Sequence, residues 1–488
     1  MNTRTKCKDV LEYLIVCIIV FVIRAFTLQG PIYNLCAEDN SIFFIVGREM
    51  VRGKILYTEV FDHKGVYIFF IYALANLISQ TSQIGVYIIQ STLTCIVMCY
   101  LFNIIRKDIK FIESTILIYA VTFMINFASL IVYGGYNEEY IALGYIVSLI
   151  LIYKHSDERY SNYKVMFIHG IIVGIILNMK QNYVLFYIPI AIDLFIKTVK
   201  NKKYKSLIQN IVSGLLGIFI ANIPMLIYTI KNNCFYDMIK ALYITSSIST
   251  YAELQIENFI EFFIYKVLGM IIISTLSIIV IKNKKSNMTA LFTSVLLFTL
   301  IGSLITGRVA MHYIMPLVIF ELPFIIYFLH RLINLKNKTV SIFATFIILF
   351  STTWYNIECT DIIYNNTKNT EYSPYRTVDI YNNEYNYIDD VVYIGYGGVI
   401  YYSTDINADR YFTLPCIKQS KYSEAIDYKE DRIRNEKPGL IIIQDWYLEK
   451  IEATLSDDIT QMIDTEYILG NSSYECRFYI RNDLVKED

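Results

Sequence analysis

Two adjacent carboxylates and a lysine frame the most highly charged stretch in the first hundred residues. Glu38 and Asp39 open this stretch, and Asp62-His63-Lys64 lies near its end. Adjacent carboxylates repel each other, and a neighbouring apolar bundle disfavours their charge, so the pKa of at least one should be raised. Such a carboxylate is suited to act as a general base. The lysine supplies a point charge that suits an anionic headgroup.

The same residues also have purely structural explanations. Asp39 precedes a polar pair and then an apolar run, which is the pattern of a residue that caps a helix of residues 40–52. Lys64 is compatible with a solvated turn from which its side chain extends to the membrane surface. The residue types alone leave both interpretations open.

Two further polar stretches interrupt the apolar sequence. Glu138 and Glu139 either add two acids to a site or begin a helix, whose dipole favours acids in its first turn. Lys180 divides one long apolar run into two short halves. A lysine at such a break is costly in lipid unless it lines a wet cavity, which favours a functional role.

A third polar stretch precedes the penultimate apolar run. Arg308 and His312 are four residues apart, so in a helix they share a face that would meet an anion outside the bundle. The alternative is a pair of interfacial anchors, with Tyr313 in the aromatic belt. Glu321 lies deep within the run and is either a functional residue or the partner of a polar neighbour such as Asn222.

The composition indicates that a membrane protein positions these residues. Of the 488 residues, 55% are hydrophobic and 18% are charged, whereas about a quarter of the residues in a soluble protein are charged. The hydrophobic residues fall in runs of about 15–22, and about 20 are needed to cross the hydrocarbon core. The net charge of −1 argues against a nucleic-acid partner. The nine cysteines show no metal-binding spacing, and several lie in apolar runs, which is typical of buried thiols.

We expect a polytopic α-helical protein with helices in twelve apolar runs: 10–28, 66–80, 84–105, 111–132, 140–153, 165–178, 181–197, 207–230, 260–281, 288–306, 313–333 and 338–354. The basic N-terminus resembles a retained signal anchor, because no small-residue cleavage site follows it. Short basic loops favour the cytoplasm, which places the N-terminus inside and the loop of residues 29–65 outside. The alternation is consistent only if the run 66–80 does not fully cross, so we predict about eleven full crossings within a range of 11–13 membrane helices. Arg24 and Asp193, near span ends, should extend to the membrane surface.

The character of the chain changes after Trp354. Residues 1–354 form the predicted membrane domain, and residues 355–488 are polar. Strand-like runs at 391–394, 440–443 and 478–480, with a helix-like piece at 423–437, predict a small α/β domain outside the membrane. Gly395-Tyr396-Gly397-Gly398 follows the first of these runs and is interpreted as a turn, because it lacks the lysine and the helix start of a phosphate loop.

The first charged stretch also resembles a known family. The matching residues are Asp39-Asn40-Ser41-Ile42-Phe43-Phe44-Ile45-Val46-Gly47-Arg48-Glu49-Met50, Gly53, Tyr57 and Phe61-Asp62-His63-Lys64-Gly65. They resemble the first extracytoplasmic loop of C-type (GT-C) membrane glycosyltransferases, in particular bacterial relatives of protein O-mannosyltransferases and lipid A aminoarabinose transferases. The resemblance implies a GT-C fold with a catalytic loop at 29–65 and an ordered outer domain.

The resemblance also implies roles for individual residues. Asp39 matches the family's catalytic aspartate, and Lys64 matches a lysine that contacts the donor phosphate. The second acidic site corresponds to Glu138 and Glu139, the later lysine to Lys180, and the His/Tyr-Pro motif to His312, Tyr313 and Pro316. Many relatives have a glutamate where this chain has Asn40, and here Glu38 precedes the aspartate instead, which leaves open which acid is the base.

The implied reaction is the transfer of a sugar, with inversion, from a polyprenyl-phosphate donor to a cell-envelope acceptor on the outer face of the membrane. Phosphate leaves as an anion, so the second carboxylic acid of a glycosidase is unnecessary. Lys64, Lys180, Arg308, His312 and Tyr313 would hold the phosphate, and Asp62, His63, Glu138 and Glu139 would support the site, the last two by orienting Lys64 or binding the acceptor. No cofactor is expected, and a divalent metal ion is the alternative source of positive charge. The acceptor is a glycan, a lipid or a protein, and the alternative function is a transporter, flippase or polymerase of lipid-linked sugars.

Overall fold

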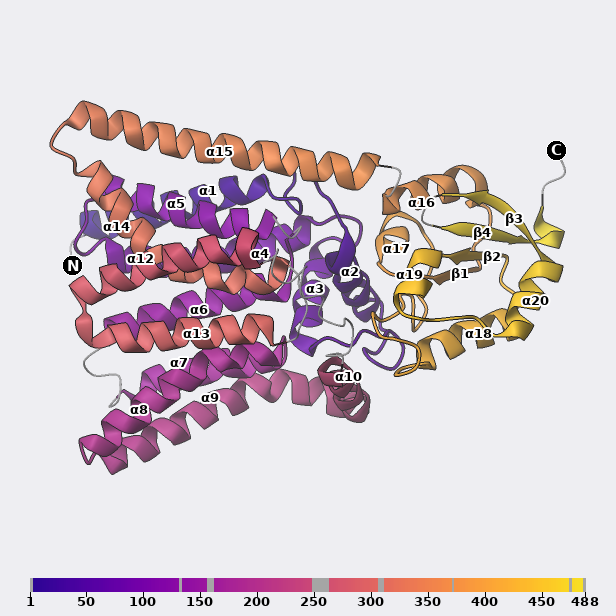
Figure 1. The fold of residues 1–488 in the computed structure, drawn as a ribbon, viewed down its shortest axis with the longest axis horizontal. Helices are drawn as coiled ribbons and strands as arrows, with labels where there is room; N and C mark the ends of the chain where they lie inside the picture. The colour runs from indigo at the N-terminus through magenta and orange to yellow at the C-terminus, as the bar shows by residue number, and fades with distance from the viewer. Residues whose placement is uncertain are drawn as a thin grey trace.

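The computed structural model describes residues 3–130, 134–155, 162–247, 263–305, 311–370, 373–473 and 476–485. Long apolar helices lie side by side in a bundle, and a small domain with a β-sheet lies beyond one end of it (Figure 1). The protein is therefore a polytopic helical membrane protein with a small C-terminal α/β domain.

Each apolar run of the sequence forms a helix, because a backbone in lipid must satisfy its own hydrogen bonds. The helices of the bundle are α1 (Thr3–Ala25), α4 (Ile84–Ile105), α5 (Phe111–Leu130), α6 (Asn137–Lys154), α7 (Tyr163–Leu177), α8 (Ile188–Lys200), α9 (Tyr204–Lys231), α12 (Leu268–Lys284), α13 (Thr289–Leu304), α14 (Leu322–Ile333) and α15 (Lys338–Asn369). Two 3-10 segments, η1 (Gln181–Tyr187) and η4 (Met311–Glu321), lead directly into α8 and α14.

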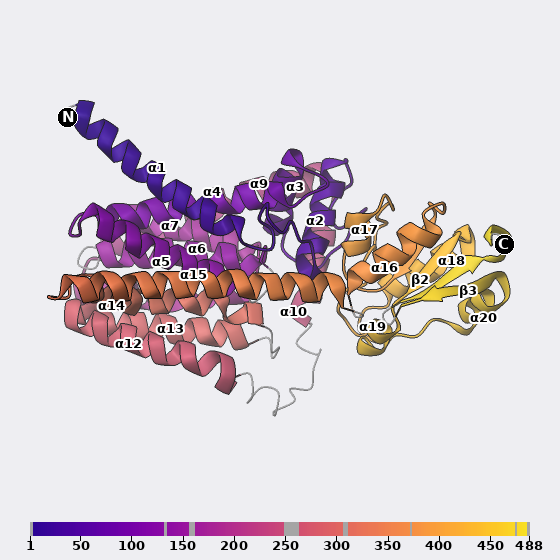
Figure 2. The ribbon, with the colours of Figure 1, turned by 90° about the horizontal axis from the view of Figure 1, so that it is seen from above.

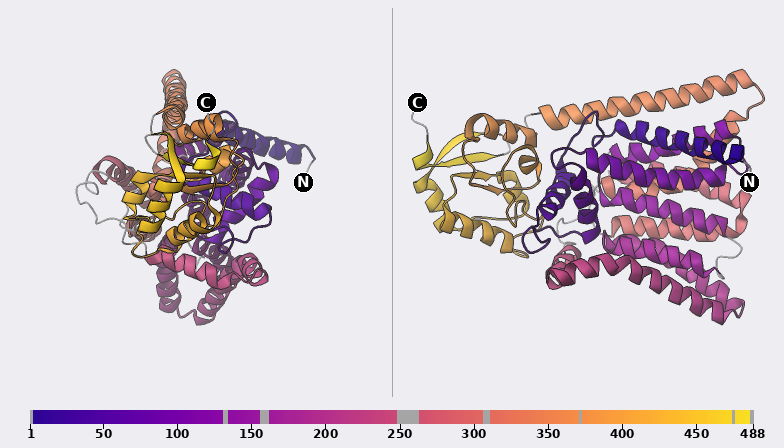
Figure 3. Two further views of the ribbon diagram at one scale, coloured as in Figure 1. Left: turned by 90° about the vertical axis from the view of Figure 1, so that its right-hand side faces the viewer. Right: turned by 180° about the vertical axis from the view of Figure 1, so that it is seen from behind.

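Six helical segments of the described chain are long and apolar enough to cross a membrane: Ile84–Ile105, Gln181–Lys200, Tyr204–Lys231, Ser286–Leu304, His312–Ile333 and Lys338–Asn369. Helix α3 (Val66–Ile78) has only 13 residues, or about 20 Å, against a hydrocarbon core of about 30 Å. Together with α2 (Glu38–Val51), it lies across the end of the bundle rather than along it (Figures 1 and 3). This agrees with the prediction that residues 66–80 do not fully cross, while the total of eleven crossings stays a prediction.

The two ends of the bundle differ in what they carry. The N-terminal end of α1 and the α8–α9, α12–α13 and α14–α15 turns lie at one end, and α2, α3, α10 (Phe235–Ser247) and the C-terminal domain lie at the other (Figures 1 and 2). The basic loops are thus on the side opposite the predicted catalytic loop. Helix α15 continues without a break to Asn369 and reaches the C-terminal domain.

The C-terminal domain contains a four-stranded sheet in the order β1-β2-β4-β3. Its strands are β1 (Val391–Ile394), β2 (Leu440–Ile443), β3 (Tyr467–Ser472) and β4 (Arg477–Arg481); β1 and β2 are parallel, and the other pairs are antiparallel. Its helices are α16 (Pro374–Ile380), α17 (Val399–Ser403), α18 (Glu424–Glu436), α19 (Asp445–Lys450) and α20 (Asp457–Glu466). The three predicted strands and the helix at 423–437 are confirmed, whereas the mostly exposed edge strand β3 was not predicted.

Two predictions about charges within the bundle are wrong. Arg24 does not extend to the membrane surface: it is 2% exposed and donates a hydrogen bond of 2.8 Å to Oε1 of Gln90. Asn222 does not pair with Glu321, because its side-chain oxygen accepts a hydrogen bond of 2.5 Å from Asn178. In both cases polar groups on neighbouring helices satisfy each other within the bundle, where unsatisfied groups are costly.

Candidate active site

Asp39 lies in the first turn of α2 and directs its carboxylate away from the helix. The N-cap of α2 is Ala37, whose backbone N–H donates to the side-chain oxygen of Asn40 at 2.8 Å. The predicted alternative, in which Asp39 merely caps the helix, is therefore wrong. Oδ1 of Asp39 accepts a hydrogen bond from the hydroxyl of Tyr396, and Oδ2 lies 3.6 Å from Nζ of Lys64. The Asp39 and Lys64 side chains are each 17% exposed, so both remain partly accessible to solvent.

Lys64 is held by a tight turn at the end of the same loop. Oδ1 of Asp62 accepts a hydrogen bond of 2.9 Å from the backbone N–H of Lys64, which is the geometry of an Asx turn. Oδ2 of Asp62 lies 3.7 Å from Nζ of Lys64, and that ammonium lies 5.0 Å from the ring centroid of Phe43. The ammonium thus lies between two carboxylates and an aromatic ring. We call Asp39, Asp62 and Lys64 the first charged cluster.

The charges in this cluster determine the ionisation of Asp39. Burial would raise the pKa of the Asp39 carboxyl, but Lys64, His312, the Tyr396 hydroxyl and His63 together outweigh burial and hold the pKa well below its usual range. Burial would lower the pKa of Lys64, but Asp39 and Asp62 outweigh it and raise that pKa. The raised pKa expected for one of the two acids is therefore not found at Asp39, which is ionised at neutral pH.

A second ion pair lies between α6 and the break after α7. Nζ of Lys180 lies 2.6 Å from Oε1 of Glu138 and 3.4 Å from the ring centroid of Tyr313. The ring of Tyr183 lies 5.6 Å away, and the Tyr183 hydroxyl donates a hydrogen bond of 2.9 Å to the backbone oxygen of Tyr313. The hypothesis that Glu138 orients Lys64 is corrected, because the ion pair of Glu138 is with Lys180. We call Lys180 and Glu138 the second charged pair.

His312 connects the first charged cluster with the second charged pair. Its ring stacks on Tyr136 with the centroids 4.8 Å apart and the planes inclined by 14°. It interacts electrostatically with Asp39 and Lys64 and also with Glu138 and Lys180. Both groups of charges therefore lie close enough to His312 to interact with it.

The backbone also fixes these two groups relative to each other. The N–H of Tyr67, in the first turn of α3, donates a hydrogen bond of 3.1 Å to the carbonyl of Asn178, two residues before Lys180. A Cβ atom on Gly65 would lie 2.2 Å from the same carbonyl oxygen, so only glycine permits this approach. The glycine after Lys64 thus allows the loop that carries Lys64 to contact the break after α7.

Not every predicted residue joins this arrangement. Glu139 pairs with Arg24 at 3.4 Å and accepts a hydrogen bond from Gln90, so its described partners lie on α1 and α4. His63 is buried, and its Nδ1 lies 4.0 Å from Oδ1 of Asp62. Glu38 begins α2, but its side chain lies outside the described part of the structure, as does Arg308. Among the described residues, no group of three or more His, Cys, Asp or Glu side chains is arranged to hold a metal ion.

The comparisons with known proteins agree with this arrangement of helices. Residues 63–228 match the model of a family described as dolichyl-phosphate-mannose-protein mannosyltransferase. A crystal structure of ArnT from Cupriavidus metallidurans bound to undecaprenyl phosphate superposes with a TM-score of 0.57 at 10% identity, covering 96% of this chain and 97% of that chain. The chain has the GT-C fold. The apo structure of the same ArnT gives the same score and identity with 98% of both chains covered.

More distant or absent matches complete the comparison. The oligosaccharyltransferase AglB from Archaeoglobus fulgidus, in complex with an inhibitory peptide and a dolichol-phosphate, has a TM-score of 0.46 at 10% identity, covering 99% of this chain and 75% of that chain. No curated protein sequence matches the chain. The ArnT-like fold and the family model over residues 63–228 confirm the resemblance of the chain to GT-C glycosyltransferases.

One residue that contacts Asp39 was missed by the sequence analysis. Tyr396, whose hydroxyl bonds to Asp39, belongs to the turn after β1 that the sequence analysis treated as a turn only. Gly397 has a φ of +98°, a conformation that favours glycine, so the turn interpretation itself was right. The available signal was an aromatic residue between glycines directly after a strand, although nothing local connects it with a residue 357 positions away.

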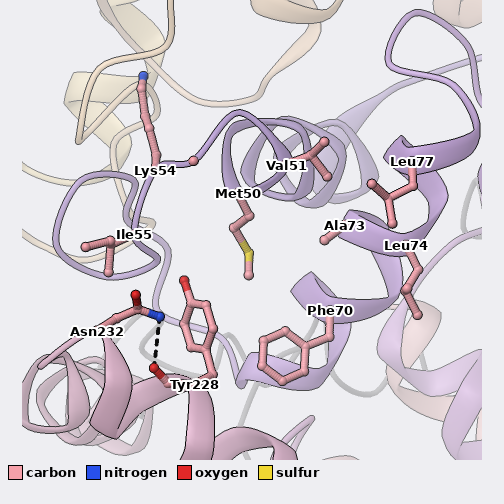
Figure 4. A pocket seen from close by; sticks show the side chains of 11 residues that line it. Met50, Val51, Lys54, Ile55, Phe70, Ala73, Leu74, Leu77, Tyr228 and Asn232 are labelled. Atoms are coloured by element: carbon pink, nitrogen blue, oxygen red, sulfur yellow. Dashed lines mark hydrogen bonds between the residues drawn. The ribbon is translucent and has the colours of Figure 1, made fainter.

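A cavity of about 460 Å³ lies at the other end of α2, near its last residues (Figure 4). Its lining is mostly apolar: Met50, Val51, Gly53, Lys54, Ile55, Phe70, Ala73, Leu74, Leu77, Tyr228 and Asn232. None of the predicted site residues is among them. The cavity is therefore separate from the first charged cluster.

Proposed function

We propose that the chain is a membrane glycosyltransferase that moves a sugar from a polyprenyl-phosphate donor to a hydroxyl of a cell-envelope acceptor. The observation that carries this proposal is the pair formed by Asp39 and Lys64, 3.6 Å apart at one end of a bundle with the GT-C fold. A carboxylate that is ionised and still accessible can accept a proton, and an ammonium beside it can stabilise a departing phosphate.

The transfer needs one base and one anion site. The acceptor oxygen would bond to the anomeric carbon from the face opposite the phosphate, while its proton passes to Asp39. The bond between the anomeric carbon and the phosphate oxygen breaks, and its electron pair leaves with the phosphate. Inversion at the sugar follows from this single displacement. Glu38 is the second candidate for the base.

Lys64 would couple donor binding to the strength of the base. Without substrate, Lys64 holds the pKa of Asp39 low, which makes the carboxylate a weak base. A donor phosphate that contacts the ammonium of Lys64 adds a negative charge beside Asp39 and competes for its cation, and both effects raise the pKa of Asp39. The base would therefore gain proton affinity only when the donor is in place.

The second charged pair would complete the anion site. His312 interacts electrostatically with both Lys64 and Lys180, and Lys180 lies over the ring of Tyr313. Arg308 is proposed from the sequence to join them. Glu138 would hold Lys180 in place until the donor arrives, and Asp62 and His63 would hold Lys64. Glu139 would stabilise the start of α6 through Arg24.

The class of the donor is proposed from two kinds of support. The matching family model describes dolichyl-phosphate-mannose-protein mannosyltransferases, and the similar ArnT structure is bound to undecaprenyl phosphate. The chain is a multi-pass membrane protein, and the positions of its basic loops support a cytoplasmic N-terminus and an extracytoplasmic C-terminal domain. The proposed domains are 1–354 for transfer and 355–488 outside the membrane.

A turnover assay tests the proposal. Full-length protein in membranes would receive a panel of undecaprenyl-phosphate pentoses and hexoses, and the release of free undecaprenyl phosphate would be measured. We expect release by the wild type, a loss of two to three powers of ten in Asp39→Asn, and wild-type release in Asp193→Asn, which removes an acid near the other end of the bundle.

Each other outcome has a defined meaning. Near wild-type turnover in Asp39→Asn, combined with a loss in Glu38→Gln, would move the base to Glu38. No release by the wild type from any donor, together with movement of an intact donor across the bilayer, would refute the transferase and favour the flippase, because only a transferase frees undecaprenyl phosphate.

A further inference from the structure

We propose that the C-terminal domain completes the active site, and that Tyr396 is a positioning residue that fixes the carboxylate of Asp39. The inference rests on the proposed function and adds a residue that the first loop does not contain. Tyr396 comes from the turn after β1, and its hydroxyl donates to Oδ1 of Asp39 across the boundary between the two domains.

The two oxygens of the Asp39 carboxylate have different partners. Oδ1 is occupied by the Tyr396 hydroxyl, and Oδ2 faces the ammonium of Lys64 at 3.6 Å. A carboxylate held by both oxygens cannot rotate about its terminal torsion without losing one contact. The Tyr396 bond therefore keeps Oδ2 directed at the space that Lys64 and the proposed donor phosphate share, and Oδ2 is the oxygen that would take the proton.

Tyr396 is itself held firmly within the C-terminal domain. Its backbone N–H donates a hydrogen bond of 2.8 Å to Oε1 of Gln444, and its carbonyl accepts one of 3.0 Å from the hydroxyl of Tyr393. Its ring stacks on the buried ring of Tyr447 with the centroids 5.1 Å apart and the planes inclined by 25°. Both the backbone and the ring are thus fixed before Tyr396 meets Asp39, which reduces the entropy cost of the contact.

The turn that carries Tyr396 is docked tightly on α2. The N–H of Gly398 donates a hydrogen bond of 2.8 Å to Oγ of Ser41, and a Cβ atom on Gly398 would lie 2.6 Å from the Ser41 carbonyl oxygen. Phe44 packs edge-on against Tyr402 at 5.0 Å, and Arg48 donates a hydrogen bond of 2.9 Å to a backbone oxygen of the same domain.

Ser41, Phe44 and Arg48 are spaced three and four residues apart, so they occupy one face of α2. The C-terminal domain therefore contacts two full turns of the helix that begins beside Asp39, and not only its tip. Its docking fixes the orientation of α2 as well as the position of the carboxylate.

The chemistry of the phenol suits a positioning role and not a catalytic one. Burial and the neighbouring Asp39 carboxylate raise the pKa of Tyr396 well above its usual value, so the phenol keeps its proton and remains a donor. A hydrogen bond to a charged acceptor is worth about 1.5–3 kcal/mol. Because each 1.4 kcal/mol corresponds to a factor of ten, loss of this bond should lower turnover by about ten- to a hundredfold.

The test compares Tyr396→Phe with Tyr467→Phe in the full-length chain. Tyr467 lies in the same domain, is buried, and donates one hydrogen bond of 2.9 Å to the carbonyl of Pro438, so the control loses an equivalent hydroxyl away from Asp39. With the undecaprenyl-phosphate sugar that supports wild-type turnover, Tyr396→Phe should lower kcat by about ten- to a hundredfold and leave KM within about twofold. Tyr467→Phe should keep the wild-type kcat.

A second measurement detects the contact without turnover. With 3-fluorotyrosine placed at position 396, the ¹⁹F resonance should shift when Asp39→Asn is introduced and should not shift with Asp193→Asn. An unchanged resonance, an unchanged kcat in Tyr396→Phe, or a lower acceptor KM with undiminished kcat would overturn the role of Tyr396. The last result would mean that the hydroxyl only occupies the place of the acceptor. Failure of the wild type with every donor would instead refute the proposed function.

Discussion

Replacement of Lys64 by methionine should change both the rate and the pH dependence of transfer. The substitution keeps the length and the apolar stem of the side chain but removes the only ammonium described within 4 Å of the carboxylates of both Asp39 and Asp62. Two carboxylates then remain in a largely buried site without their shared cation. The proposed donor phosphate loses the same cation.

The size of the effect follows from the geometry. At 3.6 Å and an effective dielectric constant of about 20, the attraction between the two charges is about 4–5 kcal/mol. Each 1.4 kcal/mol is a factor of ten, so Lys64 favours the ionised form of Asp39 by about a thousandfold. Loss of one preorganised charge at a developing anion also typically costs two to three powers of ten in rate. We therefore expect Lys64→Met to lower kcat/KM by at least about a hundredfold at pH 7.

The pH profile separates the two roles of Lys64. The pKa of Asp39 is held well below its usual range in the wild type, so the proposed base is ionised and the rate should be flat across mildly acidic pH. In Lys64→Met the pKa of Asp39 rises, so the carboxyl protonates at a higher pH and activity should be lost as pH falls. Turnover of Lys64→Met should therefore increase with pH, whereas turnover of the wild type should not.

The assay would measure release of undecaprenyl phosphate between about pH 4.5 and 8 for the wild type, Lys64→Met and Lys64→Arg. Lys64→Arg retains the charge and should keep the flat profile. Lys107→Met, at an exposed lysine in a basic loop at the opposite end of the bundle, is the matched control. A profile of Lys64→Met that runs parallel to the wild type would show that Lys64 does not control Asp39. A rate within tenfold of the wild type would remove Lys64 from the phosphate site.

Two further predictions follow from neighbouring contacts. Glu138→Gln should lower turnover, because Lys180 loses its only described carboxylate partner. Glu139→Gln should mainly lower the thermal unfolding temperature, because it breaks the buried pair with Arg24, a change that typically costs about 3–5 kcal/mol. Equal effects on rate and stability in the two variants would contradict this. Gly398→Ala would place a Cβ atom 2.6 Å from a backbone oxygen of α2 and should lower kcat by loosening the C-terminal domain. Gly269→Ala, where nothing lies within 4 Å of the added carbon, should leave kcat unchanged, and equal kcat values in the two alanine variants would refute the close docking.

The helices and the first loop could be predicted because their signals are local. Polar groups are costly to place in lipid, so each apolar run predicts a helix of the bundle. Most predicted bounds lie close to those observed, but α15 continues to Asn369, past the predicted end at residue 354. Asp39 and Lys64 lie on one loop, and their motif and resemblance predicted that they act together. The strand β3 was missed because it is an edge strand with mostly exposed side chains, which carries no alternating apolar pattern.

The partners of the charges could not be predicted because they depend on tertiary packing. The sequence offers no reason why Glu138 should pair with Lys180 while its neighbour Glu139 pairs with Arg24. Successive helical residues point in directions about 100° apart, so adjacent acids meet different helices. A charge near a span end can either extend to the surface or find a partner, and only the packing of the neighbouring helices decides between these outcomes.

The charge balance of the described site has a consequence for the donor. The first charged cluster and the second charged pair together contain two lysines and three carboxylates, so they carry a net charge of −1 when the histidines are neutral. A lipid phosphate adds further negative charge. If the two lysines bind it, they neutralise less of the negative charge on their carboxylate partners. When Lys64 binds the phosphate, its electrostatic interaction with Asp39 weakens and the proton affinity of Asp39 rises. Asp39 can then accept the proton of the acceptor when the donor is in place. Because the net charge is negative, binding of a phosphate beside His312 needs a further cation. We propose that Arg308, four residues before His312 in the sequence, supplies this cation.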